Sequence, residues 1–323
     1  EIGGTVGVIE SLPYIESVRQ LKWELGENNS MVIHLTLLPY LASSGELKTK
    51  PSQHSVRQLM ESGIQADVLV CRTEYNIPKE QRAKLAQFCN VPLENVIECK
   101  DLETIYEVPI YLQKQHFDDV VLKELDLKSD KQADLKEWKN FLKKYQHPKK
   151  KVEIALVGKY VSLQDSYKSI AEAFIHAGAN LETEVKIRWV YSGDVNTDNL
   201  EETFKGIDGM LIAPGFGDRG IEGKIQAAKY ARENNIPLLG ICLGMQIMTI
   251  EFARNVLGMT KANSMEFDTS TPEPVISLME EQKNVVDKGG TMRLGAWKCT
   301  LKPGSKLAEI YGTKNISERH RHR

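Results

Sequence analysis

The chain has 323 residues, which is enough for two domains that each contain a full hydrophobic core. Its 27% of charged and 41% of hydrophobic residues are ordinary for a globular protein, and a net charge of −2 gives no reason to expect nucleic acid or an anionic membrane as a partner. No apolar run reaches the roughly 18 residues of a membrane span, no signal-peptide pattern is present, and five scattered cysteines without zinc or disulfide spacing favour a cytoplasmic location.

The first ten residues are rich in glycine, which suggests a loop whose backbone comes close to a ligand. This segment does not match the phosphate-binding pattern of a P-loop. Ser11 is expected to cap a helix that runs to about Leu25, with Pro13 in its first turn. Residues 31–38 then predict a buried strand that Pro39 ends.

The polar segment Ser43–Gln53 has two interpretations. Its spacing favours a solvated loop, whereas Lys48, Thr49 and Lys50 together suit a clamp for an anionic phosphate. Beyond it, strands and helices alternate, which predicts a parallel α/β layer structure. The expected elements are helices over 54–63 and 78–88, strands over 66–72 and 95–99, and a mostly helical stretch over 105–125.

A lysine-rich change in composition over residues 128–151 predicts an interdomain helix and linker. A second alternation follows and predicts a doubly wound α/β domain whose ligands lie at the carboxyl ends of its strands. The expected strands are 152–158, 185–191, 210–213 and 237–241, and the expected helices are 166–177, 197–204, 221–233 and 244–258.

Cys242 lies in the sequence Gly-Ile-Cys-Leu-Gly, the cysteine counterpart of a nucleophile elbow. Such a turn places the sulfur at a helix N-terminus, which favours the thiolate; the alternative is a buried structural cysteine. A second glycine-rich turn, Pro214–Gly220, follows another expected strand, where its N–H groups suit an oxyanion. After residue 258 the alternation weakens, and 263–267, 289–295 and 318–323 are expected to be polar loops.

At this point several motifs match one family. The chain resembles CTP synthase, and the matching segments occur in the family's order over nearly the whole chain. They are EIGGTVG, SGELKTKPSQHSVRQL, FCNVP, VGKY, PGFGDRG, LGICLGMQ, ANSMEF, GGTMRLG and ERHRHR. The cysteine elbow alone occurs in other class I glutamine amidotransferases, but KTKPSQ and GGTMRLG are particular to CTP synthase.

The resemblance implies two parallel-sheet α/β domains: part of a P-loop-type synthetase domain over residues 1–127, a connection over 128–151, and a flavodoxin-like glutaminase domain over 152–323. It implies that ATP phosphorylates UTP, that ammonia from glutamine displaces the phosphate to give CTP, and that Mg²⁺ is required. GTP as activator, CTP as inhibitor and a homotetramer formed through the synthetase domain are also implied.

The resemblance also assigns residues. Cys242 matches the nucleophile that forms a glutamyl thioester, Glu1 matches a magnesium ligand, and Arg293 lies in the segment linked to GTP. The residues that match the glutamine site are Gly215, Leu243, Gly244, Met245, Gln246, Glu266 and Arg323. Those that match the UTP or CTP site are Val8, Ile9, Glu10, Lys48, Thr49, Lys50, Pro51, Ser52, Gln53 and Lys84, and those that match the ATP segment are Lys100, Asp101 and Leu102.

Three departures from the family pattern stand out. The family has a P-loop before the position of Glu1 and a glutaminase His and Glu after that of Arg323, so we expect a fragment that does not turn over glutamine by itself. His320 and His322 belong to the ERHRHR motif and are not assigned to the triad. Val8 replaces the usual Asp, and Pro214-Gly replaces Pro-Gly-Gly. Two other interpretations remain open: a different glutamine amidotransferase, and a non-catalytic paralogue that acts by assembly.

Overall fold

The computed structural model describes residues 1–26, 28–129, 131–279 and 295–320. The chain forms two compact units, Glu1–Lys143 and Lys144–Arg323. Both are built on parallel sheets, so the expected α/β class is confirmed. Among the described residues, no helix combines the length and the apolar character needed to cross a bilayer.

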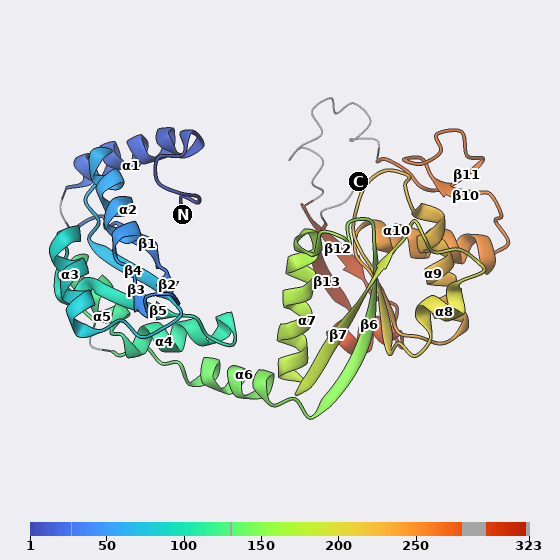
Figure 1. Ribbon diagram of the computed structural model, residues 1–323. Helices are drawn as coiled ribbons and strands as arrows, with labels where there is room; N and C mark the ends of the chain where they lie inside the picture. The colour runs from blue at the N-terminus through green and yellow to red at the C-terminus, as the bar shows by residue number, and fades with distance from the viewer. Residues whose placement is uncertain (27, 130, 280–294, 321–323) are drawn as a thin grey trace. The chain divides into compact units, whose positions relative to one another are not determined.

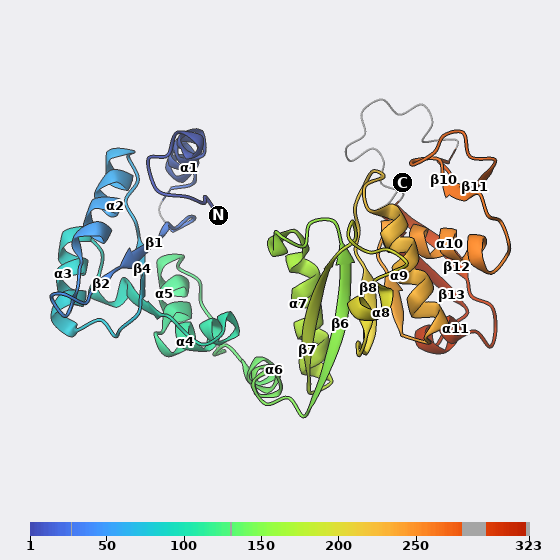
Figure 2. The ribbon, with the colours of Figure 1, turned by 45° about the vertical axis from the view of Figure 1, so that its right-hand side comes forward.

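The first unit contains a three-stranded parallel sheet in the order β1-β4-β5. Helices α2 and α3 lie on one face of the sheet and α4 and α5 on the other (Figure 2), and their buried side chains pack against the strands. The strands are β1 (Ile33–Leu38), β2 (Tyr40–Leu41), β3 (Glu46–Leu47), β4 (Val68–Thr73) and β5 (Val96–Lys100), and the helices are α1 (Leu12–Leu25), α2 (Lys50–Glu61), α3 (Lys79–Cys89), α4 (Val108–Lys114) and α5 (Phe117–Glu124).

The expected buried strand over residues 31–38 is only half buried. Its side chains alternate, so that Ile33, Leu35 and Leu37 are exposed while His34 and Thr36 face α2. Thr36 donates a hydrogen bond to Ser52 at 3.0 Å. The apolar cluster under α4 and α5 covers β4 and β5 and includes no residue of β1 itself, which leaves that face of the strand uncovered.

Two local expectations in this unit are wrong. The Ser11 hydroxyl does not cap α1; it donates to the Val8 carbonyl at 2.8 Å, because Ser11 already has helical dihedral angles. Residues Lys50–Gln53 are not a loop but the first turn of α2, since Pro51 is well suited to a first helical turn, where no amide donor is needed.

Helix α6 (Lys136–Gln146) lies in the segment expected to connect the domains. Its Trp138 indole donates to the Tyr106 carbonyl at 2.7 Å, and Phe141 meets the Tyr106 ring edge-on at 5.2 Å. The aromatic residues of this lysine-rich segment therefore attach the helix to the first unit.

The second unit contains a four-stranded parallel sheet in the order β7-β6-β8-β9. This is the order 2-1-3-4 of flavodoxin-like folds. The elements are β6 (Lys150–Gly158), α7 (Lys168–Asn180), β7 (Thr183–Tyr191), α8 (Leu200–Phe204), β8 (Gly209–Ile212), α9 (Ile221–Glu233), β9 (Leu238–Gly240) and α10 (Leu243–Asn255).

Helix α7 covers one face of this sheet, and α9 and α10 cover the other (Figures 1 and 2). Side-chain alternation along the strands supplies both cores. Leu156 and Leu211 point toward α7, whereas Val157 and Met210 pack against Ala227 of α9. The carboxyl ends of all four strands therefore share one edge, between two covered faces.

The C-terminal part is more ordered than the sequence predicts. Ala262–Ser264 forms β10, which pairs with β11 (Glu273–Ile276). Asn315–His320 forms β13, antiparallel to β12 (Gly295–Thr300), and α11 (Lys306–Tyr311) lies between them in the chain. The loop prediction is wrong for residues 263–264, 295 and 318–320, because these short strands have neither clear alternation nor an apolar run. Most of 289–295 and residues 321–323 lie outside the described residues.

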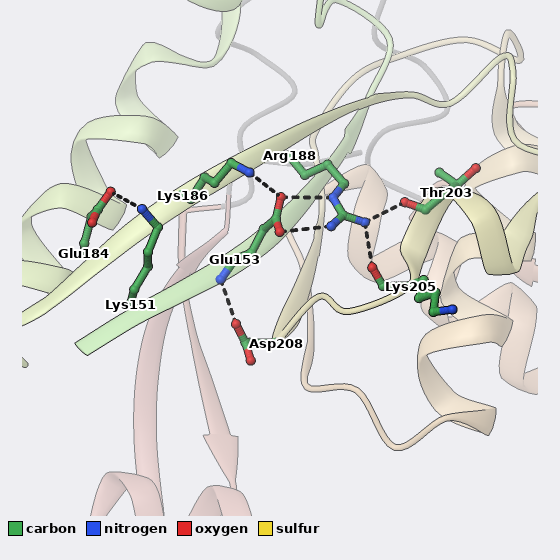
Figure 3. Close-up of polar contacts among 8 residues, drawn as sticks. All are labelled: Lys151, Glu153, Glu184, Lys186, Arg188, Thr203, Lys205 and Asp208. Atoms are coloured by element: carbon green, nitrogen blue, oxygen red, sulfur yellow. Dashed lines mark hydrogen bonds and ion pairs between the residues drawn. The ribbon is translucent and has the colours of Figure 1, made fainter.

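An ion-pair cluster fastens α8 to the sheet, as Figure 3 shows. The Arg188 guanidinium on β7 binds both carboxylate oxygens of Glu153 on β6, at 3.1 and 2.9 Å. Its remaining nitrogen donates to the carbonyls of Thr203 and Lys205, both at 3.0 Å. These carbonyls end α8, where helix geometry leaves acceptors without intrahelical partners.

Candidate functional site

Cys242 lies where β9 turns into α10, at the carboxyl edge of the second sheet. Its dihedral angles, φ 53° and ψ −105°, are unusual for a residue with a side chain. Two glycines make the turn possible. A Cβ on Gly240 would lie 2.4 Å from the backbone of Gly244, and one on Gly244 would lie 2.2 Å from the Ile212 carbonyl oxygen. The structure therefore explains why glycine occupies both positions, and it has the geometry of a nucleophile elbow.

The turn after β8 lies beside this elbow. A Cβ built on Gly215 would lie 3.5 Å from the Leu243 side chain and 4.0 Å from the Lys224 ammonium. Lys159, at the end of β6, donates to the Phe216 and Gly217 carbonyls of the same turn. Three strand ends thus bring the cysteine, the glycine-rich turn and two lysines to one edge.

The residues expected to bind glutamine have different environments. Gln246 and Leu243 are buried in the first turn of α10, whereas Met245 and Glu266 are exposed. The Glu266 carboxylate accepts a hydrogen bond from Gly217 N–H at 3.1 Å, which links the segment after β10 to the turn. Arg323 lies outside the described residues.

Sequence reasoning missed Lys159 and Lys224 as site residues. Both are buried, Lys224 completely. Burial lowers the pKa of both ammonium groups, in Lys224 to about 8. The one available signal was position: Lys159 directly follows an apolar strand, and Lys224 follows the glycine-rich turn. Lysine is so seldom buried that neither position predicts it.

In the first unit, several expected nucleotide-binding residues line one polar pocket of about 390 Å³, comprising Glu46, Leu47, Lys48, Thr49, Lys50, Gln81 and Lys84. The pocket lies beyond the carboxyl end of β1, where Lys48 N–H donates to the Pro39 carbonyl at 2.9 Å. Lys48 also pairs with Glu46, and this hydrogen bond lowers the pKa of the Glu46 carboxyl. Three lysines and one acidic residue thus line this pocket, which suits an anionic ligand.

The other residues of the expected UTP or CTP site are divided. Gln53 donates to Thr49 at 3.1 Å, so it lies beside the lysine pocket, and Pro51 is exposed at the start of α2. The Ser52 hydroxyl instead donates to the Leu37 carbonyl and is fully buried. Ile9 is 80% exposed.

The remaining residues expected at the UTP or CTP site, Val8 and Glu10, line a second pocket of about 230 Å³. It is lined by Glu1, Ile2, Gly3, Gly4, Val8, Glu10, Ser11 and Tyr14. Among the residues that the structure describes, no group of three or more His, Cys, Asp or Glu side chains is arranged to hold a metal. Magnesium commonly takes one or two protein carboxylates and completes its shell with water and phosphate oxygens, so Glu1 fits such a role.

The expected ATP segment begins at the end of β5. Asp101 N–H donates to the Thr73 carbonyl at 2.8 Å, and the Asp101 carboxylate pairs with Arg72 at 3.2 Å. Lys100 and Leu102 flank it and are half-buried. This is the carboxyl edge of the first sheet, where ligands of parallel sheets bind. Arg293, expected near GTP, lies outside the described residues.

Comparison with known proteins identifies both parts of the chain. Residues 162–323 match the family described as glutamine amidotransferase class-I, and residues 1–127 match the family described as CTP synthase N-terminus. The chain belongs to the CTP synthase family. CTP synthase of Flavobacterium johnsoniae is 64% identical over all 323 residues, and that of Staphylococcus carnosus is 52% identical over the same span.

These CTP synthases are longer than the chain, which spans 60% of the length of each. Among solved structures, the glutaminase domain of the Trypanosoma brucei enzyme with bound acivicin is 39% identical. The match covers 53% of this chain and 67% of that one, with a TM-score of 0.48.

Proposed function

We propose that the protein is a glutamine-hydrolysing CTP synthase. The reaction consumes UTP, ATP, glutamine and water and yields CTP, ADP, phosphate and glutamate. The observation that carries the proposal is the elbow at Cys242, formed by glycines with no space for a side chain, in a chain that also has a CTP synthase N-terminal region. Residues 1–127 act as synthetase, 128–151 as connection and 152–323 as glutaminase.

In the glutaminase reaction, the Cys242 thiolate attacks the side-chain amide carbon of glutamine. The amide C–N bond breaks when the nitrogen is protonated, ammonia leaves, and the remaining glutamyl thioester is hydrolysed to glutamate. Backbone N–H groups of the Gly215 turn and of Leu243 stabilise the oxyanion. Gln246, Glu266 and Arg323 bind the amino-acid end of glutamine, beside the backbone of Gly244 and Met245.

In the synthetase reaction, ATP phosphorylates the uracil carbonyl oxygen and ammonia then displaces the phosphate. Lys48, Lys50 and Lys84 hold the UTP or CTP phosphates, with Thr49 and Gln53 beside them. Pro51 and Ser52 complete that segment, and Val8, Ile9 and Glu10 form the other part of the pyrimidine site. Lys100, Asp101 and Leu102 contact ATP, Glu1 holds Mg²⁺, which supplies charge neutralisation at the phosphates, and Arg293 takes part in activation by GTP.

A cytoplasmic homotetramer that assembles through the synthetase domain completes the proposal. This part of the proposal rests on the resemblance to CTP synthase, the name that the relatives at 64% and 52% identity carry.

The decisive experiment is Cys242→Ala in the full-length protein. CTP formation from glutamine should fall by at least a thousandfold, because the nucleophile is gone, whereas CTP formation from added ammonium chloride should continue. Cys299→Ala is the matched control, since Cys299 is an exposed cysteine on β12, outside the β9–α10 turn, and should leave both reactions unchanged. If the wild-type protein hydrolyses glutamine but does not aminate UTP, a different glutamine amidotransferase is favoured. If the wild-type protein forms no CTP from either glutamine or ammonium chloride, a non-catalytic paralogue is favoured.

A further inference from the structure

Lys224 combines complete burial with a position in the first turn of α9. Its side chain has no solvent exposure, and its ammonium group donates to the Ala213 carbonyl at 2.9 Å. Among the described residues, no Asp or Glu carboxylate lies within ion-pair distance of it. A buried ammonium that has only a neutral acceptor is costly, so proteins rarely keep one without a role.

The backbone around Lys224 is shared with the elbow. Ile212 and Ala213 are consecutive at the end of β8. The Ile212 carbonyl accepts from Ile241 N–H at 3.1 Å and lies against Gly244, while the Ala213 carbonyl accepts from Lys224. Ile212 therefore contacts the turn that presents Cys242, and the next residue, Ala213, contacts the buried ammonium group of Lys224.

Electrostatics agree with this geometry. Burial and the neighbouring Lys159 lower the pKa of Lys224, and the charge of Cys242 opposes them by raising it. An interaction between two charges is mutual, so the ammonium also favours the thiolate. The other charged groups around the site are Asp218 and Arg219 of the glycine-rich turn and Glu266, which act on Lys159.

We propose that Lys224 is a positioning residue for the nucleophile: its ammonium is the buried counter-charge that stabilises the Cys242 thiolate and holds the Ala213 carbonyl beside the elbow. This inference rests on the proposed function in taking Cys242 as the nucleophile. The N-terminus of α10 by itself favours a thiolate, and the ammonium of Lys224 on α9 adds a second favourable charge.

The test is the pH profile of alkylation of Cys242 by iodoacetamide, a neutral reagent, in the full-length protein, with peptide mapping by mass spectrometry. The other cysteines serve as internal references, since burial raises the pKa of Cys71 to about 12 and of Cys89 to about 11. In the wild type, the profile should have its midpoint below 8.5, the ordinary value for cysteine.

Two variants separate charge from hydrogen bonding. Lys224→Met removes both, and Lys224→Gln removes the charge but keeps a donor for the Ala213 carbonyl. In each, the midpoint should rise by about one pH unit, so that alkylation at pH 7 slows about tenfold while the high-pH plateau stays the same. Lys229→Met, a less buried lysine on the same helix, is the control and should leave the profile unchanged.

A wild-type midpoint at or above 8.5, or variant profiles that superimpose on the wild type, would overturn the proposal. If Lys224→Met does not fold, the proposal is still tested by the alkylation profile of Lys224→Gln and by the midpoint of the wild-type profile. Alkylation requires neither glutamine nor UTP, so a protein that makes no CTP can still show the shift. Loss of the proposed function and loss of this inference are therefore distinguishable.

Discussion

At the scale of single residues, Val8 is the departure from the family pattern that lies in the proposed pyrimidine nucleotide site. It lines the same pocket as Glu1 and Glu10 and is 40% exposed. The backbone of Val8 is already hydrogen-bonded. Its N–H donates to the Thr5 carbonyl, and its carbonyl accepts from the N–H and the hydroxyl of Ser11. Only the side chain is therefore able to respond to a ligand, and valine offers it no acceptor.

We expect Val8→Asp to bind UTP and CTP about ten- to a hundredfold more tightly, because a hydrogen bond to a charged group contributes about 1.5–3 kcal/mol. The measurement is the UTP half-saturation and the CTP inhibition constant of the full-length protein. Val256→Asp changes a similarly exposed valine of the second unit and serves as control. Equal affinities in Val8→Asp and wild type would remove this position, and by extension Glu10, from the nucleotide site.

The candidate site illustrates what a sequence reveals at this scale. The elbow was predictable because glycine at fixed spacing around cysteine reflects a steric demand that the structure displays directly. The lysines behind it were not, because burial of Lys159 and Lys224 arises from three strand ends meeting in space. The spacing of residues along the sequence does not show that these strand ends lie close together.

At the scale of elements, the fold was predictable where strands are apolar runs and helices have apolar residues at regular spacing. All seven parallel strands of the two main sheets were expected within about three residues of their bounds. Two kinds of error remained. The exposed face of β1 depends on which helices extend over it, and the pairs β10–β11 and β12–β13 depend on contacts between short segments without clear patterns.

The Glu153–Arg188 cluster is the best test of how one element is attached to another. Its hydrogen bonds to Arg188 and Lys186 hold the pKa of Glu153 at about 2. Because the folded-state pKa is lower than the unfolded value of about 4.3, the pair stabilises fully above pH 4.3 and loses its contribution as the pH falls toward 2.

Glu153→Gln should therefore lower the urea midpoint of the second unit at pH 7, and the gap from wild type should narrow steadily below pH 4.3. Unfolding is followed by tryptophan fluorescence, since Trp189 lies next to Arg188 on β7. Glu184→Gln, which breaks the more exposed pair with Lys151, should change little at any pH. A gap that stays constant down to pH 3 would show that Figure 3 depicts a packing contact rather than a charge interaction.

At the scale of the whole molecule, the chain has separate hydrophobic cores. Leu85 is fully buried in the core of α2, α3 and the first sheet, and Ile225 in that of α9, α10 and the second. We therefore expect each core to unfold as its own cooperative unit.

We expect Leu85→Ala to remove about 2–5 kcal/mol from the first unit and nothing from the second, and Ile225→Ala to do the reverse. Hydrogen exchange read by mass spectrometry separates the two, using amides of β4 and β5 against those of β6 and β8. If either substitution accelerates exchange equally in both sheets, the two cores unfold as one cooperative unit.

That residues 1–323 alone do not turn over glutamine stays a prediction, and an ammonia-release assay on this segment tests it.

The strained backbone at Cys242 has a further consequence, which concerns the thermal stability of variants at this position. A side chain at φ 53° and ψ −105° costs about 1–3 kcal/mol, more than the roughly 0.5–1 kcal/mol that glycine loses in chain entropy. Cys242→Gly should therefore melt at a higher temperature than Cys242→Ala. Selection for heat tolerance alone would therefore favour glycine at this position and remove the thiol on which the proposed glutaminase reaction depends.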